Sequence, residues 1–227
     1  LFISHSAMSN MPFKLSPSTL NLIKECPRCF WLTQHDVWSR PNGIFPSLPS
    51  GMDRVLKAHF DSFRDKNELP PELKKLKGVK LFNNIELLKT WRNNLKGVQY
   101  KDKNGNLIRG AVDNILEKGS KLIVLDYKTR GFPLKEDTAE HYQDQLDLYN
   151  FLLRKNEYKT ENYAYLLFYH PDKVNAEGEI LFNTDLVKMG ISISNAEKII
   201  KNALKTLEIG MPDSSEECEF CKWREIL

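Results

Sequence analysis

All four cysteines of this 227-residue chain fall into two Cys-x-x-Cys pairs, one near each end of the sequence. The first pair is Cys26 and Cys29, and the second is Cys218 and Cys221. Four thiolates at such spacings are typical of a site for Zn²⁺ or for an iron–sulfur cluster, and both accept a roughly tetrahedral set of thiolates. One shared site would tie the two ends of the folded chain together, and this constrains the fold more than any other feature.

Two other interpretations of the cysteines remain open, namely two separate redox pairs or buried thiols without a partner. Disulfides are disfavoured because the sequence has the features of a cytoplasmic protein, whose thiols stay reduced. Residues 1–10 are polar and lack the pattern of a secretory signal. No apolar run approaches the roughly 20 residues of a membrane-spanning helix. We therefore expect a cytoplasmic protein without a membrane segment.

The length and composition permit one large domain with a sizeable core, at 41% hydrophobic and 28% charged residues. We expect residues 1–12 to be a tail or residues added to the natural chain, and residues 13–227 to form a single domain. The formal net charge is only +3. This value is compatible with nucleic-acid binding through a local basic patch but does not argue for it.

The order of helical and strand patterns predicts a mixed α/β domain. Ser16 and Pro17 begin a helix, and Pro27 bends or breaks it. Further helical patterns cover residues 51–64, 85–95, 138–154 and 196–207. Strand patterns cover residues 98–100, 107–116, 122–129, 163–169 and 179–182, with an Asn-Gly hairpin turn between the first two.

Residues 110–115 and 122–129 have the pattern of a β-hairpin whose second strand ends in charged residues. Side chains alternate along a strand, so Asp126 and Lys128 point to the same face. Asp113 is expected beside them on the neighbouring strand. Two carboxylates and an ammonium are costly to bury unless they pair with one another or hold a metal. The hairpin is therefore the candidate active site, and a salt bridge at the end of a strand is the alternative.

Three motifs follow one another between the cysteine pairs: Gly110-x-x-Asp113, Asp126-x-Lys128 and Gln145-x-x-x-Tyr149. This series resembles the PD-(D/E)XK nuclease superfamily. More narrowly it resembles the RecB-like branch, which includes the RecB nuclease domain and CRISPR-associated exonucleases with an iron–sulfur cluster. The resemblance implies a restriction-endonuclease-like core, in which helices flank a mixed central β-sheet and the four cysteines join the termini.

The resemblance also implies a role for each residue of the hairpin. Asp113 and Asp126 would bind Mg²⁺ or Mn²⁺, with the backbone carbonyl of Tyr127 as a further oxygen ligand. Lys128 would orient the attacking water or stabilise the charge that develops on the phosphate.

Two helices would complete the site. Gln145 and Tyr149 are spaced i, i+4 and share one helix face, although both also suit a half-buried helix without catalysis. His59 would be an additional metal ligand, since the upstream helix of the family carries a histidine. Its distance along the chain from Gly51 departs from the family pattern, and a packed histidine is the alternative. His141, one turn before Gln145, is a lesser candidate.

The cysteine pattern departs from the resemblance as well. The iron–sulfur relatives carry one early and three late cysteines, whereas this chain carries two and two. The count of four thiolates is preserved, so we expect a [4Fe–4S] cluster, with Zn²⁺ as the alternative.

The resemblance implies a metal-dependent DNA nuclease that hydrolyses phosphodiester bonds at DNA ends or in single strands, in repair, recombination or CRISPR-type DNA processing. Its partners would be single-stranded DNA or duplex ends, together with proteins of a DNA-processing complex. Two alternatives are a catalytically inactive nucleic-acid-binding module with a structural four-cysteine zinc site, and a purely structural protein.

Basic and aromatic side chains supply candidates for contacts with DNA. The basic candidates for the phosphate backbone are Arg28, Lys74, Lys75, Lys77, Arg130, Lys135 and Lys173. The aromatic candidates for stacking on unpaired bases are Trp31, Trp38 and Phe132. Solvated charges and core packing, respectively, are the alternative explanations.

Overall fold

The computed structural model describes residues 12–226. The predicted tail at residues 1–12 therefore lies outside the described residues, apart from Pro12.

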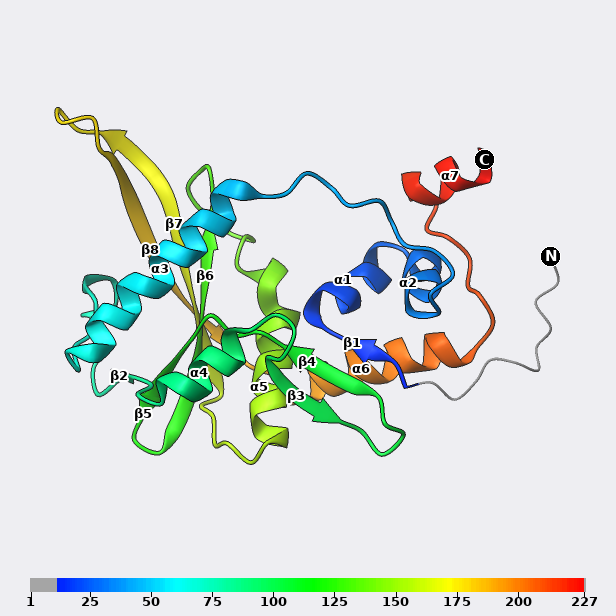
Figure 1. The fold of residues 1–227 in the computed structure, drawn as a ribbon, viewed down its shortest axis with the longest axis horizontal. Helices are drawn as coiled ribbons and strands as arrows, with labels where there is room; N and C mark the ends of the chain where they lie inside the picture. Colours follow the sequence, from blue (N-terminus) through cyan, green and yellow to red (C-terminus); the bar gives the residue numbers. More distant parts are fainter. Residues whose placement is uncertain (1–11, 227) are drawn as a thin grey trace.

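Five strands form the central sheet in the order β2–β5–β6–β7–β8 (Figure 1). Their bounds are Lys80–Leu81, Asn114–Lys118, Lys121–Thr129, Tyr163–Val174 and Ile180–Gly190, respectively. Strands β6 and β7 are parallel and the other pairs are antiparallel, so the sheet is mixed. Because parallel neighbours need a crossover connection, the chain between them forms helix α5 (Gln143–Lys155) on the way.

A smaller sheet has the order β1–β4–β3, with bounds Lys14–Leu15, Leu107–Gly110 and Val98–Lys101. The remaining helices are α1 (Pro17–Glu25), α2 (Pro27–Gln34), α3 (Ser47–Asp65), α4 (Ile85–Arg92), α6 (Ile193–Glu208) and α7 (Glu219–Ile226). Two short 3-10 helices, η2 and η3, cover Pro71–Leu73 and Glu140–Tyr142. No described helix is both long enough and apolar enough to cross a membrane.

Helices cover both faces of the central sheet. Val124 of β6 packs in the core cluster that contains residues of α5. Leu125, its neighbour in sequence, packs in a second cluster with Phe60 of α3. This alternation places α5 and α3 on opposite faces, as the period of a strand requires. The predicted restriction-endonuclease-like arrangement, a mixed sheet flanked by helices, is confirmed.

Two local predictions are wrong in their boundaries. The strand expected at residues 107–116 is divided between β4 and β5, which belong to different sheets. The strand expected to end before His170 continues as β7 to Val174. Pro171 lies next to an irregularity in the register of β7 with β8, which is where a strand tolerates proline.

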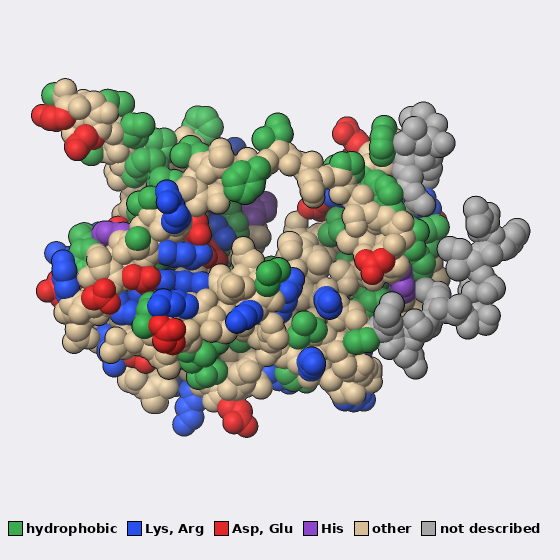
Figure 2. All heavy atoms as spheres, in the orientation of Figure 1, with side chains coloured by type: hydrophobic (Ala, Val, Ile, Leu, Met, Phe, Trp, Pro, Cys, Tyr) green, Lys and Arg blue, Asp and Glu red, His purple; other side chains and the backbone are tan. Residues whose placement is uncertain are grey.

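Helices α1, α2 and α6 pack together beside the sheet, and α7 contacts α2 (Figure 1). Residues 35–46 connect α2 with α3, and Figure 2 shows this segment arching over an open gap between the two parts of the molecule. The segment leads the chain from α2, which contains Cys29, to α3 on one face of the central sheet.

Substitution of Gly97 would test how closely the chain before β3 packs against β4 in the smaller sheet. Its φ is +66°, and a Cβ there would lie 2.5 Å from the carbonyl oxygen of Gly110. Gly78 has a similar φ of +67° but open space around it. We expect Gly97→Ala to lower the free energy of unfolding well beyond the roughly 1–2 kcal/mol of left-handed strain, because β4 must also shift. Gly78→Ala should cost the strain alone, and equal losses in urea unfolding would contradict this account of the packing.

Candidate active site

Asp126 and Lys128 lie at the end of β6, on the face that α5 covers. Asp126 is only 1% exposed. The Nζ atom of Lys128 lies 2.5 Å from Oδ2 of Asp126, so the two side chains share one face as the strand period predicts.

Gln145 connects this pair to α5. Its Oε1 accepts a hydrogen bond from Lys128 Nζ at 3.0 Å. Its Nε2 donates to the Tyr149 hydroxyl at 2.7 Å and lies 3.4 Å from Asp126 Oδ1. The structure thus brings together Asp126, Lys128, Gln145 and Tyr149.

Asp113 does not lie on the neighbouring strand, where the sequence placed it. It lies in the connection between β4 and β5, immediately before β5 begins. Its Oδ2 accepts a hydrogen bond from the backbone N–H of Tyr127 at 3.1 Å. Arg92 holds its backbone by donating to the carbonyl oxygen at 2.7 Å. Asp113 therefore reaches the end of β6 from a connection that two hydrogen bonds fix.

Helix α3 contributes two residues that the sequence analysis did not identify. Lys57 Nζ lies 2.8 Å from Asp53 Oδ2 and 3.3 Å from Asp113 Oδ1. Asp53 and Lys57 are spaced i, i+4, so they share one face of the helix. That spacing is the signal that the sequence contains, but it does not indicate that Lys57 pairs with Asp113, which lies far along the chain.

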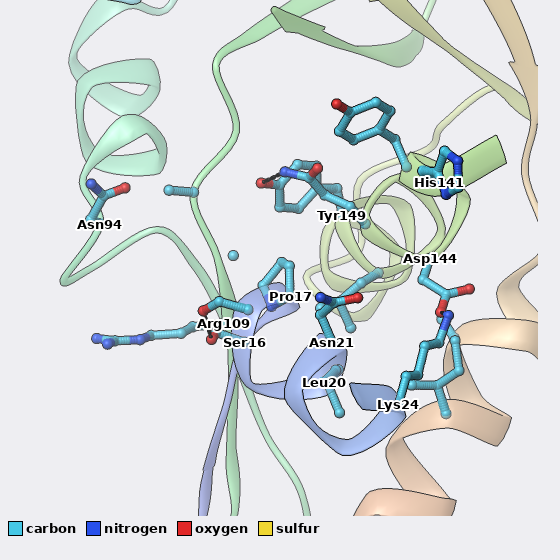
Figure 3. Close-up of a pocket in the computed structure, with 18 of the residues that line it drawn as sticks. Ser16, Pro17, Leu20, Asn21, Lys24, Asn94, Arg109, His141, Asp144 and Tyr149 are labelled. Carbon is cyan, nitrogen blue, oxygen red and sulfur yellow. Dashed lines mark hydrogen bonds and ion pairs between the residues drawn. The ribbon is translucent and has the colours of Figure 1, made fainter. Parts of the chain in front are cut away.

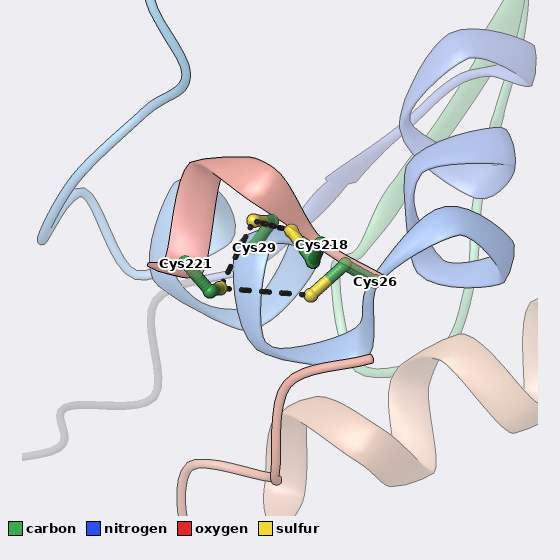
Figure 4. A group of neighbouring side chains, drawn as sticks. All are labelled: Cys26, Cys29, Cys218 and Cys221. Atoms are coloured by element: carbon green, nitrogen blue, oxygen red, sulfur yellow. Dashed lines mark hydrogen bonds between the residues drawn. The ribbon is translucent and has the colours of Figure 1, made fainter. Parts of the chain in front are cut away.

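The four cysteines form a second group, where α7 contacts α2 (Figure 4). Their sulfur atoms lie within 4.8 Å of one another, and all four side chains are buried. The shortest distances are 3.5 Å between Cys29 and Cys218 and 3.6 Å between Cys29 and Cys221. The predicted convergence of the two pairs is confirmed, and the arrangement suits a metal ion or a cluster.

A family model described as the PD-(D/E)XK nuclease superfamily matches residues 46–226. This range covers most of the chain and includes the residues at the end of β6 and on α5. The chain belongs to the PD-(D/E)XK nuclease superfamily. The match begins after the first cysteine pair, so α1 and α2 lie outside it.

Other comparisons add little to this assignment. No match was found among curated proteins. A solved structure described as "Crystal structure of SSO0001" is 15% identical, with a TM-score of 0.45, and the alignment covers 96% of this chain and 86% of the other. At that identity and score the likeness carries no argument.

Nucleases of the PD-(D/E)XK superfamily use divalent metals, and the oxygen donors around Asp126 fit such a cation. Asp126 is buried, and its Oδ2 faces the Lys128 ammonium. Asp113 and Asp53 add two more carboxylates, joined through Lys57. Carboxylate oxygens are the hard ligands that Mg²⁺ and Mn²⁺ prefer.

His59 contacts Glu72. Its Nε2 lies 3.1 Å from Glu72 Oε1, and Glu72 also accepts a hydrogen bond from the Tyr169 hydroxyl at 3.0 Å. Its ring packs edge-on against Phe63. The contacts described for His59 include neither acid of the hairpin, so its role as a metal ligand stays a prediction.

The candidates for DNA contacts are divided between core and surface. Trp31 is buried and donates to the carbonyl oxygen of Ile209, and Trp38 packs partly buried against the core. Arg28 donates to the carbonyl oxygen of Pro212. Phe132 is 78% exposed, so core packing does not explain it. The lysines at 74, 75, 77, 135 and 173 are exposed, Arg130 is half-buried, and contacts of these residues with DNA stay predictions.

Burial affects the pKa of residues in the candidate active site and in the cysteine group. Burial, and then the charge of Asp113, raise the pKa of Asp126 to about 7 despite Lys128. Burial and the charge of Asp126 also raise the pKa of Tyr149 well above its usual range, so the phenol stays protonated. Burial raises the pKa of the Cys26 thiol, but hydrogen bonds, first from the backbone of Cys29, outweigh it and lower the pKa to about 6.

The raised pKa of Asp126 predicts how stability depends on pH. Folded Asp126 holds a proton up to about pH 7, whereas the unfolded chain releases it near 3.8. Without added Mg²⁺ or Mn²⁺, this residue therefore makes the protein progressively less stable as the pH rises between those values, and the full penalty remains above them.

Asp126→Asn removes the titrating group. We expect the variant to gain thermal stability relative to the wild type across the same pH interval, with the gain constant above about pH 7. The exposed Asp137→Asn serves as the control, and unfolding is followed by circular dichroism. A difference between Asp126→Asn and wild type that does not change with pH would show that burial does not perturb this carboxyl.

Proposed function

We propose that this protein is a DNA nuclease that uses Mg²⁺ or Mn²⁺ to hydrolyse phosphodiester bonds. The observation that carries the proposal is the buried Asp126 carboxylate, which pairs with Lys128 at the strand end that the Asp113 carboxylate also contacts. A structural salt bridge does not need a second acid directed at the same strand end.

We propose Asp113, Asp126 and the backbone carbonyl of Tyr127 as ligands of the cation. Asp53 is a further candidate ligand, because it shares Lys57 with Asp113. His59 would join only if its ring left Glu72. When bound, the cation supplies an activated water and neutralises charge on the phosphate.

The protein's own groups hold and orient the reacting atoms. Lys128 presents its ammonium beside Asp126, where it stabilises the charge that develops on the phosphate. Gln145 keeps that ammonium in place through its carbonyl oxygen, while its amide group turns toward Asp126 and Tyr149. Gln145 and Tyr149 are therefore positioning residues in this proposal.

DNA is proposed over RNA from the resemblance to the RecB-like branch, which also suggests work on DNA ends or single strands in repair, recombination or CRISPR-type processing. Residues 13–227, including both cysteine pairs, would form the nuclease domain. Four cysteines grouped for a metal ion or cluster, rather than for disulfides, are typical of a reducing compartment, and we propose the cytoplasm.

Lys128→Ala and Asp126→Ala should each reduce cleavage of labelled DNA in Mg²⁺ or Mn²⁺ by about 100-fold or more, because the first removes positive charge beside the phosphate and the second removes a ligand of the cation. Lys121→Ala, at the exposed start of the same strand, is the matched control and should cleave normally. The substrates are single-stranded DNA, blunt duplex, duplexes with either overhang, and the equivalent RNAs.

Unchanged cleavage by Lys128→Ala would contradict the proposed site. A wild-type protein that binds DNA but cleaves none of these substrates would instead support the inactive binding module.

For the cysteine site we propose a [4Fe–4S] cluster, with Zn²⁺ as the alternative. The proposal rests on the resemblance to iron–sulfur nucleases and on four buried sulfur atoms in one group. Freshly purified protein should show a broad absorption band near ~400 nm, because a cluster absorbs visible light and d¹⁰ zinc does not. Cys29→Ala should lose the band, and a colourless wild type with one zinc per chain would identify zinc instead.

A further inference from the structure

A cavity of about 530 Å³ lies beside α5, where Gln145 contacts Lys128 and Asp126, and Figure 3 shows the residues that line it. Its walls come from the first turns of α1, the end of β4 and the beginning of α5. Gln145 and Tyr149 line the cavity and also belong to the candidate active site, where Gln145 contacts Asp126. A group bound in the cavity therefore lies beside the proposed position of the cleaved phosphate.

The size of the cavity fits a single nucleotide rather than a duplex. Cavities that hold small ligands measure about 300–1,000 Å³. The major groove alone of a DNA duplex is about 12 Å wide, so paired DNA is much larger than this space. An unpaired nucleotide can enter it without a second strand.

The charge of the cavity wall suits a phosphate backbone. Lys24, Lys96 and Arg109 line it, against one carboxylate, Asp144, which pairs with Lys24. Arg109 donates to the carbonyl oxygen of Leu95, and the described residues give Lys96 no carboxylate partner. Two cations on this wall therefore remain available to a ligand.

Polar and aromatic groups on the same wall suit a base. Figure 3 shows Asn21 and Asn94 beside the cavity, and each amide offers both a donor and an acceptor for the edge of a base. The ring of Tyr142 lines the cavity and lies 4.5 Å from Lys128 Nζ. An aromatic ring at this position offers a surface on which an unpaired base can stack.

We propose that the cavity binds an unpaired nucleotide of the substrate strand, with Lys96 and Arg109 contacting its phosphates. This inference rests on the proposed nuclease function and deepens it, because it requires the strand to be single-stranded next to the cut. Duplex DNA then becomes a substrate only where an end is frayed or overhanging.

The test measures binding without cleavage. A fluorescein-labelled single-stranded oligothymidine is titrated with the full protein in buffer without Mg²⁺ or Mn²⁺, and anisotropy gives the affinity. Lys96→Glu and Arg109→Glu should each weaken binding by about tenfold and lower the slope of log affinity against log salt by about 1. Lys103→Glu, the same charge change in the exposed β3–β4 turn, is the matched control and should bind like the wild type.

A further variant tests whether the volume of the cavity matters for binding. Asn21 is exposed on α1 at the cavity wall, so Asn21→Trp narrows the cavity without entering the core. It should weaken single-strand binding while its circular dichroism and unfolding temperature match the wild type.

The outcomes separate this inference from the proposed function. If all three cavity variants bind the single strand as tightly as Lys103→Glu, the cavity inference fails, whether or not Lys128→Ala abolishes cleavage. If the wild type binds blunt duplex as tightly as single strand and cuts it internally, the inference also fails while the nuclease function stands. Weak binding by the cavity variants, with normal binding by Lys103→Glu, supports a strand site at this cavity.

Discussion

The candidate active site depends on one costly arrangement, a carboxylate that is 1% exposed at the end of a central strand. Such a group is retained only if its surroundings compensate for the lost water. Lys128 supplies the nearest charge, and Gln145 holds Lys128 from the crossover helix. Asp113 adds a second negative charge, which raises the pKa of Asp126 and makes a bound cation more favourable. Strand β6, helix α5 and the β4–β5 connection bring these groups together.

Glycine at position 110 shows how closely the backbone is adapted to this arrangement. A Cβ at Gly110 would lie 2.7 Å from Cε1 of Tyr149, so the end of β4 passes directly against the tyrosine ring. The same strand end leads into the connection that holds Asp113. The Gly110-x-x-Asp113 motif therefore combines a close approach of the backbone with the placement of an acid three residues later.

The sequence predicted those features that local periodicity or a motif determines. The capped helix after Ser16, the shared face of Asp126 and Lys128, the convergence of Gln145 with them, and the grouping of the cysteines are all confirmed. The division of residues 107–116 between two sheets was not predictable, because both halves have strand propensity and only tertiary pairing separates them. The place of Lys57 in the site was not predictable either, because its partner Asp113 lies far along the chain.

The grouping of the cysteines has a consequence for the order in which the molecule is assembled. Cys26 and Cys221 are 195 positions apart, so their meeting closes a loop that contains nearly the whole chain. Closing so long a loop is entropically unfavourable until other contacts have shortened it. During synthesis the four-sulfur group cannot be completed until α7 has left the ribosome, so a metal or cluster that needs all four sulfurs is acquired only after both sheets have been made.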